Sequence, residues 1–391
     1  MSMFSRRTDW KLTPNRFTQA HQEAVREGRE VLDLTVSNPT RAAFEYDETA
    51  ILDALRNSKS VDYDPQPKGL RSAREAVAEY YKCGAGAPAR EIDPEKIVLT
   101  TSTSEGYSYV FRLLCNPDDE VLVPKPSYPL FDFLADLQDV KLVPYPLIYD
   151  HGWQIDFPTL EQAITEKTRA VVLVHPNNPT GSFVSADEQA RLNELCREHN
   201  LALIVDEVFL DYAYEGRPKP SFAANDDTLT FTLSGLSKIA ALPQMKLAWI
   251  VVSGPEKEAT EAMHRLEVIA DTYLSPNAPV QLAAETLLKQ RGKIQSQLMS
   301  RILANLTELD LQLAQHTSCS RLFVEGGWYA VLRVPVTKSD EDLAIQLLRE
   351  RSVLVHPGHF YDFPNDGYLV LSLITPEATF REGISRVLQA F

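Results

Sequence analysis

The middle of the 391-residue chain alternates short, continuous runs of apolar residues with amphipathic stretches. Unbroken Val, Ile and Leu runs are typical of strands that are covered on both faces of a sheet. Between two of these runs, residues 186–199 place their apolar side chains on one side at helical spacing. This alternation predicts an α/β fold whose large domain holds a mainly parallel, seven-stranded sheet flanked by helices. We expect its strands at Ile97–Thr101, Glu120–Pro124, Lys141–Tyr145, Ala170–His175, Ala202–Asp206, Leu229–Leu233 and Leu247–Val252.

After residues 275–277 (Ser-Pro-Asn) the pattern changes, and residues 278–315 are predicted to form long helical segments. A mixed pattern follows and predicts a smaller α+β domain, completed by the N-terminal segment. Its strands are expected near Trp328–Val334, Val353–His356 and Tyr368–Leu373. The expected division is therefore a large domain at 46–276 and a small domain made of 1–45 and 277–391.

The composition excludes several classes of protein. A formal net charge of −15 argues against nucleic acid as a partner, because phosphate backbones bind to basic surfaces. The four cysteines form no CxxC pair, so free thiols are expected rather than a disulfide or a metal site. The chain starts without an apolar leader and has no stretch long enough to span a bilayer. We therefore expect a cytoplasmic protein that does not engage a membrane.

Three polar segments follow predicted strands: 175–181 (His-Pro-Asn-Asn-Pro-Thr-Gly), the acid Asp206, and the hydroxyl-rich run that ends at Lys238. In parallel α/β sheets, ligands collect beyond the carboxyl ends of the strands. An amide, a carboxylate and an amine at that edge are what a pyridoxal-phosphate pocket requires. Each also has a plainer explanation on its own, as a turn asparagine, a helix N-cap and a surface lysine.

Taken together, these segments resemble the class I/II aminotransferases, the aspartate aminotransferase-like branch of pyridoxal-phosphate fold type I. The resemblance runs from about Leu32 to the C-terminus, and the Asn-Pro-Thr-Gly string at 178–181 is its most specific short motif. It implies an aminotransferase that uses pyridoxal 5'-phosphate. Such an enzyme moves an amino group from an amino donor to a 2-oxo acid acceptor by a ping-pong mechanism.

The resemblance also implies roles for individual residues. Lys238 would hold the cofactor as a Schiff base and then carry the proton between substrate and cofactor. Asp206 would keep the pyridine nitrogen protonated, Asn178 would hydrogen-bond the ring oxygen O3′, and Tyr128 would stack on the ring. Tyr63 matches a tyrosine that reaches the phosphate in the neighbouring subunit, which implies a homodimer with shared active sites.

The cofactor phosphate is expected at residues 101–106, which follow a predicted strand and open a predicted helix. Ser102, Thr103 and Ser104 offer hydroxyls and backbone N–H groups there, as anion sites at helix N-termini do. Ser237 and Lys246 would complete this phosphate site. A plain helix cap explains residues 101–106 equally well.

The substrate side departs from the family pattern. Val370 stands where the family carries the arginine that grips the substrate α-carboxylate, and valine cannot bind a carboxylate. Arg333 and Arg41 are candidate replacements, although an ordinary surface arginine explains each of them as well. Phe209 stands in place of a tyrosine that hydrogen-bonds O3′. We therefore expect a raised pKa for the Schiff base.

Further departures concern the phosphate and the substrate wall. Lys246 replaces the arginine that usually binds the phosphate in this family. Lysine supplies the charge but lacks the two coplanar N–H donors of a guanidinium group. Gly235 replaces a phosphate-contacting serine, while Ser102 and Ser37 stand where relatives carry glycine.

Two rival functions stay open. The same cofactor also serves lyases, decarboxylases and racemases, and the missing arginine makes that branch harder to exclude. A non-catalytic regulator's effector module is the other rival, although no basic N-terminal helix-turn-helix is present in the sequence.

Overall fold

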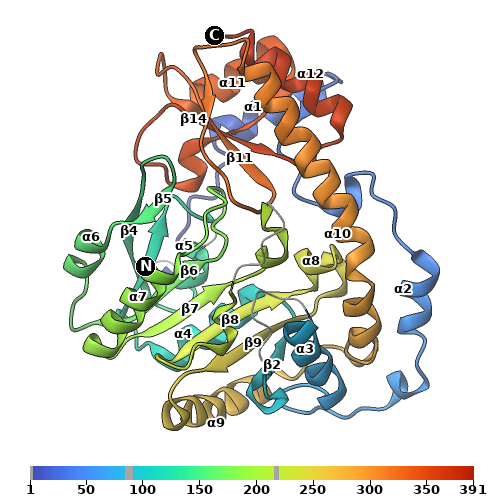
Figure 1. The fold of residues 1–391 in the computed structure, drawn as a ribbon, viewed down its shortest axis with the longest axis vertical. Coiled ribbons are helices and arrows are strands. Elements are labelled where there is room, and N and C mark those ends of the chain that lie inside the picture. Colours follow the sequence, from blue (N-terminus) through green and yellow to red (C-terminus); the bar gives the residue numbers. More distant parts are fainter. Residues whose placement is uncertain (1–2, 84–90, 130, 215–219) are drawn as a thin grey trace.

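The structure is a computed structural model of the chain, and it describes residues 3–83, 91–129, 131–214 and 220–391. Within these residues, eight strands form the large sheet, in the spatial order β2-β9-β8-β7-β6-β3-β4-β5 (Figure 1). Their bounds are β2 Ile97–Thr100, β3 Glu120–Lys125, β4 Lys141–Tyr149, β5 Trp153–Ile155, β6 Thr168–Val174, β7 Ala202–Asp206, β8 Thr230–Gly235 and β9 Ala248–Ser253. The pairs β8-β7, β7-β6, β6-β3 and β3-β4 are parallel, whereas β9 and β5 run antiparallel to their neighbours.

Helices cover both faces of this sheet because successive side chains of its strands point to opposite sides. Ala170 and Val172 pack with α4, α5 and α9, whereas Val171 and Leu173 pack with α6 and α7. A third apolar cluster joins α3 and the first half of α10 to β2 and β9. The helices are α1 Arg16–Arg26, α2 Glu48–Leu55, α3 Arg71–Cys83, α4 Thr103–Leu114, α5 Phe131–Asp136, α6 Phe157–Gln162, α7 Ala186–His199, α8 Leu236–Ile239, α9 Glu256–Tyr273, α10 Ala278–Leu313, α11 Asp340–Arg351 and α12 Glu377–Leu388.

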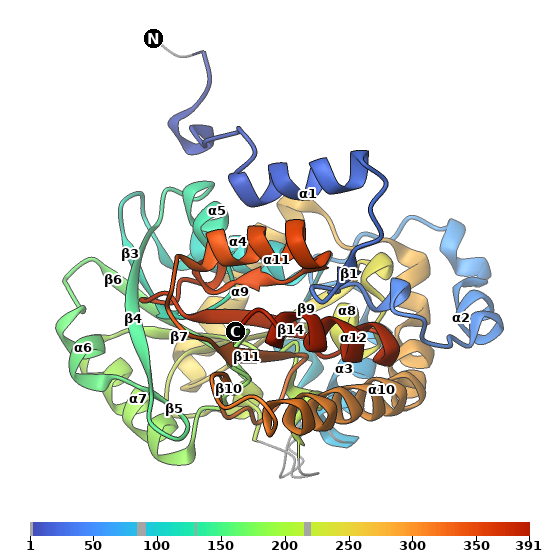
Figure 2. The same ribbon diagram turned by 90° about the horizontal axis from the view of Figure 1, so that it is seen from above.

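A smaller antiparallel sheet has the order β10-β11-β14-β13. Its strands are β10 Ser320–Arg321, β11 Tyr329–Arg333, β13 His356–Pro357 and β14 Tyr368–Ser372, and a separate parallel pair joins β1 Leu32–Asp33 to β12 Val353–Leu354. The N-terminal helix α1 packs beside α11 (Figure 2). Both ends of the chain therefore contribute to one apolar core, which contains Phe17 and Leu34 as well as the strands of the small sheet.

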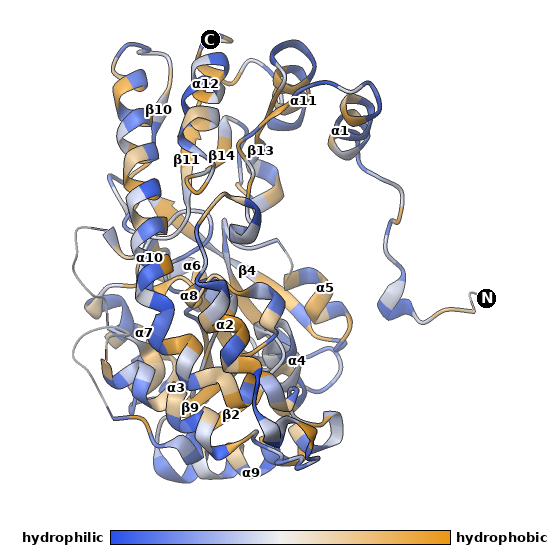
Figure 3. Cartoon of the chain, turned by 90° about the vertical axis from the view of Figure 1, so that its right-hand side faces the viewer, coloured by the Kyte–Doolittle hydropathy of each residue, from blue (hydrophilic) through white to orange (hydrophobic). Residues whose placement is uncertain are grey.

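Helix α10 is 36 residues long and supplies buried side chains to two cores. Val280 and Leu287 belong to the cluster beside β2 and β9, whereas Leu298 and Ile302 belong to the core of the small sheet. Polar and apolar residues alternate along its length (Figure 3), as expected for a helix with one buried side. Among the described residues, none of the helices combines the length and the apolar character that crossing a lipid bilayer requires.

The predicted fold class is confirmed, with three differences in detail. The large sheet has an eighth strand, β5, which pairs with the last residues of β4. The predicted strand at 353–356 is wrong as a single element, because β12 pairs with β1 whereas His356, in β13, pairs with β14. The helical segments at 278–315 form one continuous helix. The division of the chain at 46 and 276 stays a prediction.

Candidate active site

The polar segments after four strands of the large sheet meet around one cavity of about 480 Å³. Residues that follow β2, β6, β7 and β8 line it, together with side chains from the small sheet. The predicted site residues that line it are Ser102, Thr103, Ser104, Tyr128, Asn178, Asp206, Ser237 and Lys238. The topology therefore brings together groups that are more than one hundred residues apart in the sequence.

Asp206 ends β7 and is 9% exposed. Its Oδ2 accepts a hydrogen bond from the Tyr107 hydroxyl at 3.3 Å, and its Oδ1 accepts one from the backbone N–H of Val208 at 3.1 Å. Burial raises the pKa of the Asp206 carboxyl to about 6, while these two donors and the charge of Lys238 oppose the rise. The site therefore holds a carboxylate that is mostly ionised at neutral pH.

Lys238 lies in α8, a single helical turn directly after β8, and its side chain is partly buried. Its Nζ is 4.8 Å from the centroid of the Trp328 ring and 5.6 Å from that of the Phe209 ring. Burial lowers the pKa of this amine to about 8, although Asp206 opposes the shift. A larger fraction of the amine is therefore unprotonated than in an ordinary lysine, and only the unprotonated amine is nucleophilic.

Asn178 presents an unused polar atom to the cavity. Its Oδ1 is buried and has no hydrogen-bond partner within the described ranges. Buried polar atoms nearly always have a partner, so this oxygen is in place for a ligand. The loop around it is fixed by Asn177, whose Nδ2 donates to the Pro126 carbonyl at 3.0 Å and to the Thr180 Oγ1 at 2.9 Å.

Gly181 holds the same loop against the segment that leads into β11. Its φ is +69°, a conformation that side chains other than glycine rarely adopt. A Cβ at this position would overlap the Val324 side chain and the carbonyl oxygen of Gly326. The loop that carries Asn178 therefore contacts the core of the small sheet.

Helix α4 begins at the cavity, where Ser102 is its N-cap and accepts a hydrogen bond from the backbone N–H of Glu105 at 3.2 Å. The first turn of a 12-residue helix presents free backbone N–H groups and a partial positive charge. Thr103 and Ser104 add hydroxyls to that wall, and Ser237 adds another. This part of the cavity can accept a phosphate.

The remaining wall is mostly aromatic and comes from four segments. Tyr128, Phe209, Tyr329 and Tyr361 line it together with His356. The hydroxyl of Tyr361 lies 3.1 Å from Nδ1 of His356. Burial raises the pKa of Tyr128 to about 12 and lowers that of His356 below its usual value, so all these side chains are neutral near pH 7.

Several predicted residues lie elsewhere. Lys246 is exposed and does not line the cavity, so its role at the phosphate stays a prediction. Tyr63 is 80% exposed and lines a different depression, beside Asn277. Arg41 and Arg333 are both exposed and do not line the cavity, so neither is in place to bind the substrate carboxylate in this structure.

Sequence reasoning did not name several residues that line the site, among them Tyr107 and His356. Tyr107 lies one helical turn after Thr103, which is a usable signal because residues four apart in a helix share a face. His356 is a single histidine before a Pro-Gly pair, and nothing in that pattern indicates a site. Only the strand pairing of the small sheet places it at the cavity.

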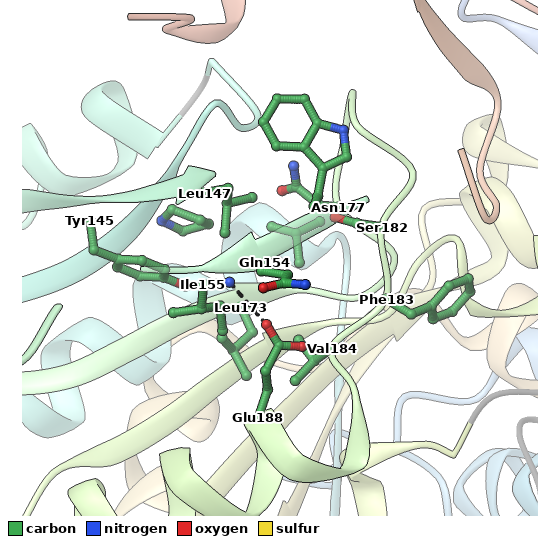
Figure 4. A pocket seen from close by; sticks show the side chains of 13 residues that line it. Tyr145, Leu147, Gln154, Ile155, Leu173, Asn177, Ser182, Phe183, Val184 and Glu188 are labelled. Atoms are coloured by element: carbon green, nitrogen blue, oxygen red, sulfur yellow. Dashed lines mark hydrogen bonds between the residues drawn. The ribbon is translucent and has the colours of Figure 1, made fainter. Parts of the chain in front are cut away.

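A second cavity, of about 20 Å³, is lined by Asn177, Trp153, Gln154 and Glu188 (Figure 4). An Oε1 atom of Glu188 accepts a hydrogen bond from the backbone N–H of Ile155 at 2.9 Å. The volume suits a single water and not a substrate. The candidate active site is the cavity of about 480 Å³, because it brings together Lys238, Asp206 and Asn178.

Comparison with known proteins gives the site its context. The family described as aminotransferase class I and II matches residues 29–387. The glutamate-pyruvate aminotransferase AlaA of Haemophilus influenzae is 31% identical over 367 residues, which cover 90% of this chain and 89% of that protein. The S-alkyl-thiohydroximate lyase SUR1 of Arabidopsis thaliana is 27% identical over 321 residues, or 80% of this chain and 69% of the lyase.

Among solved structures, the alanine aminotransferase of Pyrococcus furiosus superimposes with a TM-score of 0.89 at 24% identity, covering 99% of both chains. At that identity the match shows a shared fold. The family match over nearly the whole chain, with the relative from Haemophilus influenzae, shows the family itself. This chain belongs to the class I and II aminotransferases.

Proposed function

We propose that the chain is a pyridoxal-phosphate-dependent aminotransferase that moves an amino group between an amino acid and a 2-oxo acid by ping-pong chemistry. The observation that carries the proposal is the set of three groups in one cavity. These are the amine of Lys238 with its pKa lowered to about 8, the buried carboxylate of Asp206, and the amide of Asn178, whose Oδ1 has no partner among the described residues. Each group matches one requirement of the cofactor.

The residues present fit pyridoxal phosphate. The N-terminus of α4, with Ser102, Thr103 and Ser104, suits the phosphate, and Ser237 adds a hydroxyl. Asp206 suits the protonated ring nitrogen because an ionised acid stabilises the positive form. The Nδ2–H of Asn178 suits the ring oxygen, because an amide nitrogen donates and a deprotonated ring oxygen accepts. When bound, the cofactor supplies an electron sink for the bond that breaks at the substrate Cα.

The chain's own residues then do three things. The amine of Lys238 would hold the cofactor and, when free, would accept the proton from the substrate Cα and carry it to the cofactor. A lysine whose pKa is about 8 can do both near neutral pH. Tyr107 orients the Asp206 carboxylate through its hydrogen bond, and the aromatic wall excludes water from the reacting atoms.

The names of the relatives suggest a first choice of substrates. The Haemophilus influenzae relative is named a glutamate-pyruvate aminotransferase and the Mycobacterium bovis relative, at 29% identity, an alanine aminotransferase. We infer that L-alanine and L-glutamate with their 2-oxo acids are the substrates to examine first.

We also infer a homodimer in which Tyr63 reaches the phosphate of the other subunit. In the single chain, Tyr63 and Val61 are 80% and 89% exposed, and Leu52 in the preceding helix is 61% exposed. Covering such apolar side chains on association is favourable. Sedimentation should therefore give a dimer, and Tyr63→Phe should weaken cofactor binding without changing the dimer. A wild-type protein that sediments as a monomer would contradict this inference. So would a Tyr63→Phe variant that binds the cofactor as tightly as wild type.

The test of the function starts from purified protein reconstituted with pyridoxal phosphate. Wild type should become yellow and be trapped covalently by borohydride, whereas Lys238→Ala should not. Lys257→Ala is the matched control, because Lys257 is an exposed lysine in α9 that does not line the cavity. Each amino acid is then added alone, and loss of the visible absorbance identifies donors. A protein that stays colourless and untrapped with excess cofactor would refute the proposal.

The lyase alternative keeps the same cofactor site. It is favoured by Val370 at the position of the missing arginine and by the similarity to the Arabidopsis thaliana lyase. Incubation with an amino acid and no acceptor separates the two functions. One equivalent of pyridoxamine phosphate per site indicates transamination, whereas repeated turnover indicates the lyase. Parallel lines in steady-state kinetics with both substrates would further support ping-pong transfer.

A further inference from the structure

The wall where a substrate carboxylate would lie has no arginine. Val370, in β14, is 1% exposed and does not line the cavity. Among the described residues that line it, Lys238 and His356 are the only ones with basic side chains. Lys238 belongs to the cofactor side, so His356 is the basic group left for the substrate.

The strand pairing explains why His356 can replace an arginine at 370. β13 and β14 are antiparallel, and His356 is the direct partner of Val370. Directly paired residues point to the same face of a sheet, with Cβ atoms about 4.5–5.5 Å apart. The imidazole therefore starts beside the place from which an arginine at 370 would reach into the cavity.

A neighbouring hydroxyl orients the ring. Tyr361 is 5% exposed, and its hydroxyl lies 3.1 Å from Nδ1 of His356. When that hydroxyl donates to Nδ1, the proton of the neutral ring is on Nε2. Nε2 has no hydrogen-bond partner in the part of the chain that the structure describes. In that tautomer Nε2–H is a free donor on a side chain that lines the cavity.

We propose that His356, held by Tyr361, binds the α-carboxylate of the substrate through Nε2–H in place of the family's arginine. This inference rests on the proposed function, because it names how that function's substrate is recognised. One N–H replaces a two-donor fork, so recognition is less directional and depends on a single bond. A hydrogen bond to a charged group corresponds to about a tenfold to hundredfold change in an equilibrium constant.

The test compares L-alanine with L-alaninamide, which keeps the size and loses the negative charge. Each compound reacts with the holoenzyme in a single turnover that is monitored by the cofactor absorbance. If another amino acid is the better donor, that amino acid and its amide replace this pair. We expect His356→Ala to lower kcat/KM for the acid by about tenfold or more, with less than a twofold change for the amide. His356→Gln, which keeps an N–H donor, should lose less.

His359→Ala is the matched control, because His359 lies three residues on, is exposed and does not line the cavity. It should react like wild type with both compounds. Equal losses for acid and amide in His356→Ala would show a merely structural role and overturn the proposal, as would an unchanged rate with the acid. A wild-type holoenzyme that reacts with no amino acid would instead refute the proposed function, and this inference with it.

Discussion

Replacing Lys238 by methionine should make the cofactor-free protein more stable at neutral pH. The pKa of the amine is lowered from 10.5 to about 8 in the folded protein, which means that folding disfavours its charged form. At about 1.4 kcal/mol per pKa unit, the charge costs the folded state at most about 3 kcal/mol, since partial exposure lets water screen it. Methionine has a similar length, carries no charge and packs well against aromatic rings such as Phe209 and Trp328.

The sign of the pH dependence distinguishes charge from packing. Below pH 8 the amine is charged in both states, so the full cost is present. Between pH 8 and 10.5 only the unfolded chain stays charged, and the cost decreases as the pH rises. The advantage of Lys238→Met should therefore fall from about 3 kcal/mol at pH 7 to about 1 kcal/mol at pH 10.

The assay is urea unfolding of the apo proteins at both pH values. Lys246→Met is the control, because an exposed lysine should change the free energy of unfolding by less than about 0.5 kcal/mol. A Lys238→Met protein that is no more stable than wild type at pH 7 would refute the reasoning. So would an equal gain at both pH values, which would assign the effect to packing.

Three further outcomes follow from the site. Tyr107→Phe removes a donor to Asp206 and should raise that carboxyl's pKa from about 6 by about one unit. The pH below which cofactor affinity falls, measured between pH 5 and 8, should rise by the same amount, and an unchanged pH would contradict this. Phe209→Tyr should lower the pH at which the bound cofactor's visible absorbance titrates, because the new hydroxyl can donate to the ring oxygen and favour its deprotonated form. An unchanged titration would show that position 209 does not make this hydrogen bond. Gly181→Ala should destabilise the protein by roughly 3 kcal/mol through overlap with Val324, measured by urea unfolding; a loss below about 1 kcal/mol would show that the loop can adjust.

The meeting of Lys238, Asp206 and Asn178 at one cavity could be expected from the sequence, because each lies at or just beyond the end of a strand in the parallel part of the large sheet. Asp206 is the last residue of β7, and Lys238 lies three residues beyond the end of β8. Parallel strands bring such positions to one edge whatever their separation along the chain. Local patterns and a topological rule were enough there.

The substrate side was harder, because its residues meet through long-range pairing. His356 reaches the cavity only since β13 pairs with β14, and no local pattern specifies that register. Strand β5 was missed for a related reason. The predicted strand ended at Tyr145, yet β4 continues through Pro146 to Tyr149 near the edge of the sheet, where proline is tolerated.

Helix α10 has a consequence for cooperativity. Leu287 is buried in the cluster beside β2 and β9, whereas Leu298 is buried in the core of the small sheet, and one unbroken helix carries both. If either core unfolds, half of that helix loses the side chains against which it packs, and short unsupported helices are marginal in water. The two cores should therefore lose structure together, as a single calorimetric peak in which neither survives as a folded remnant.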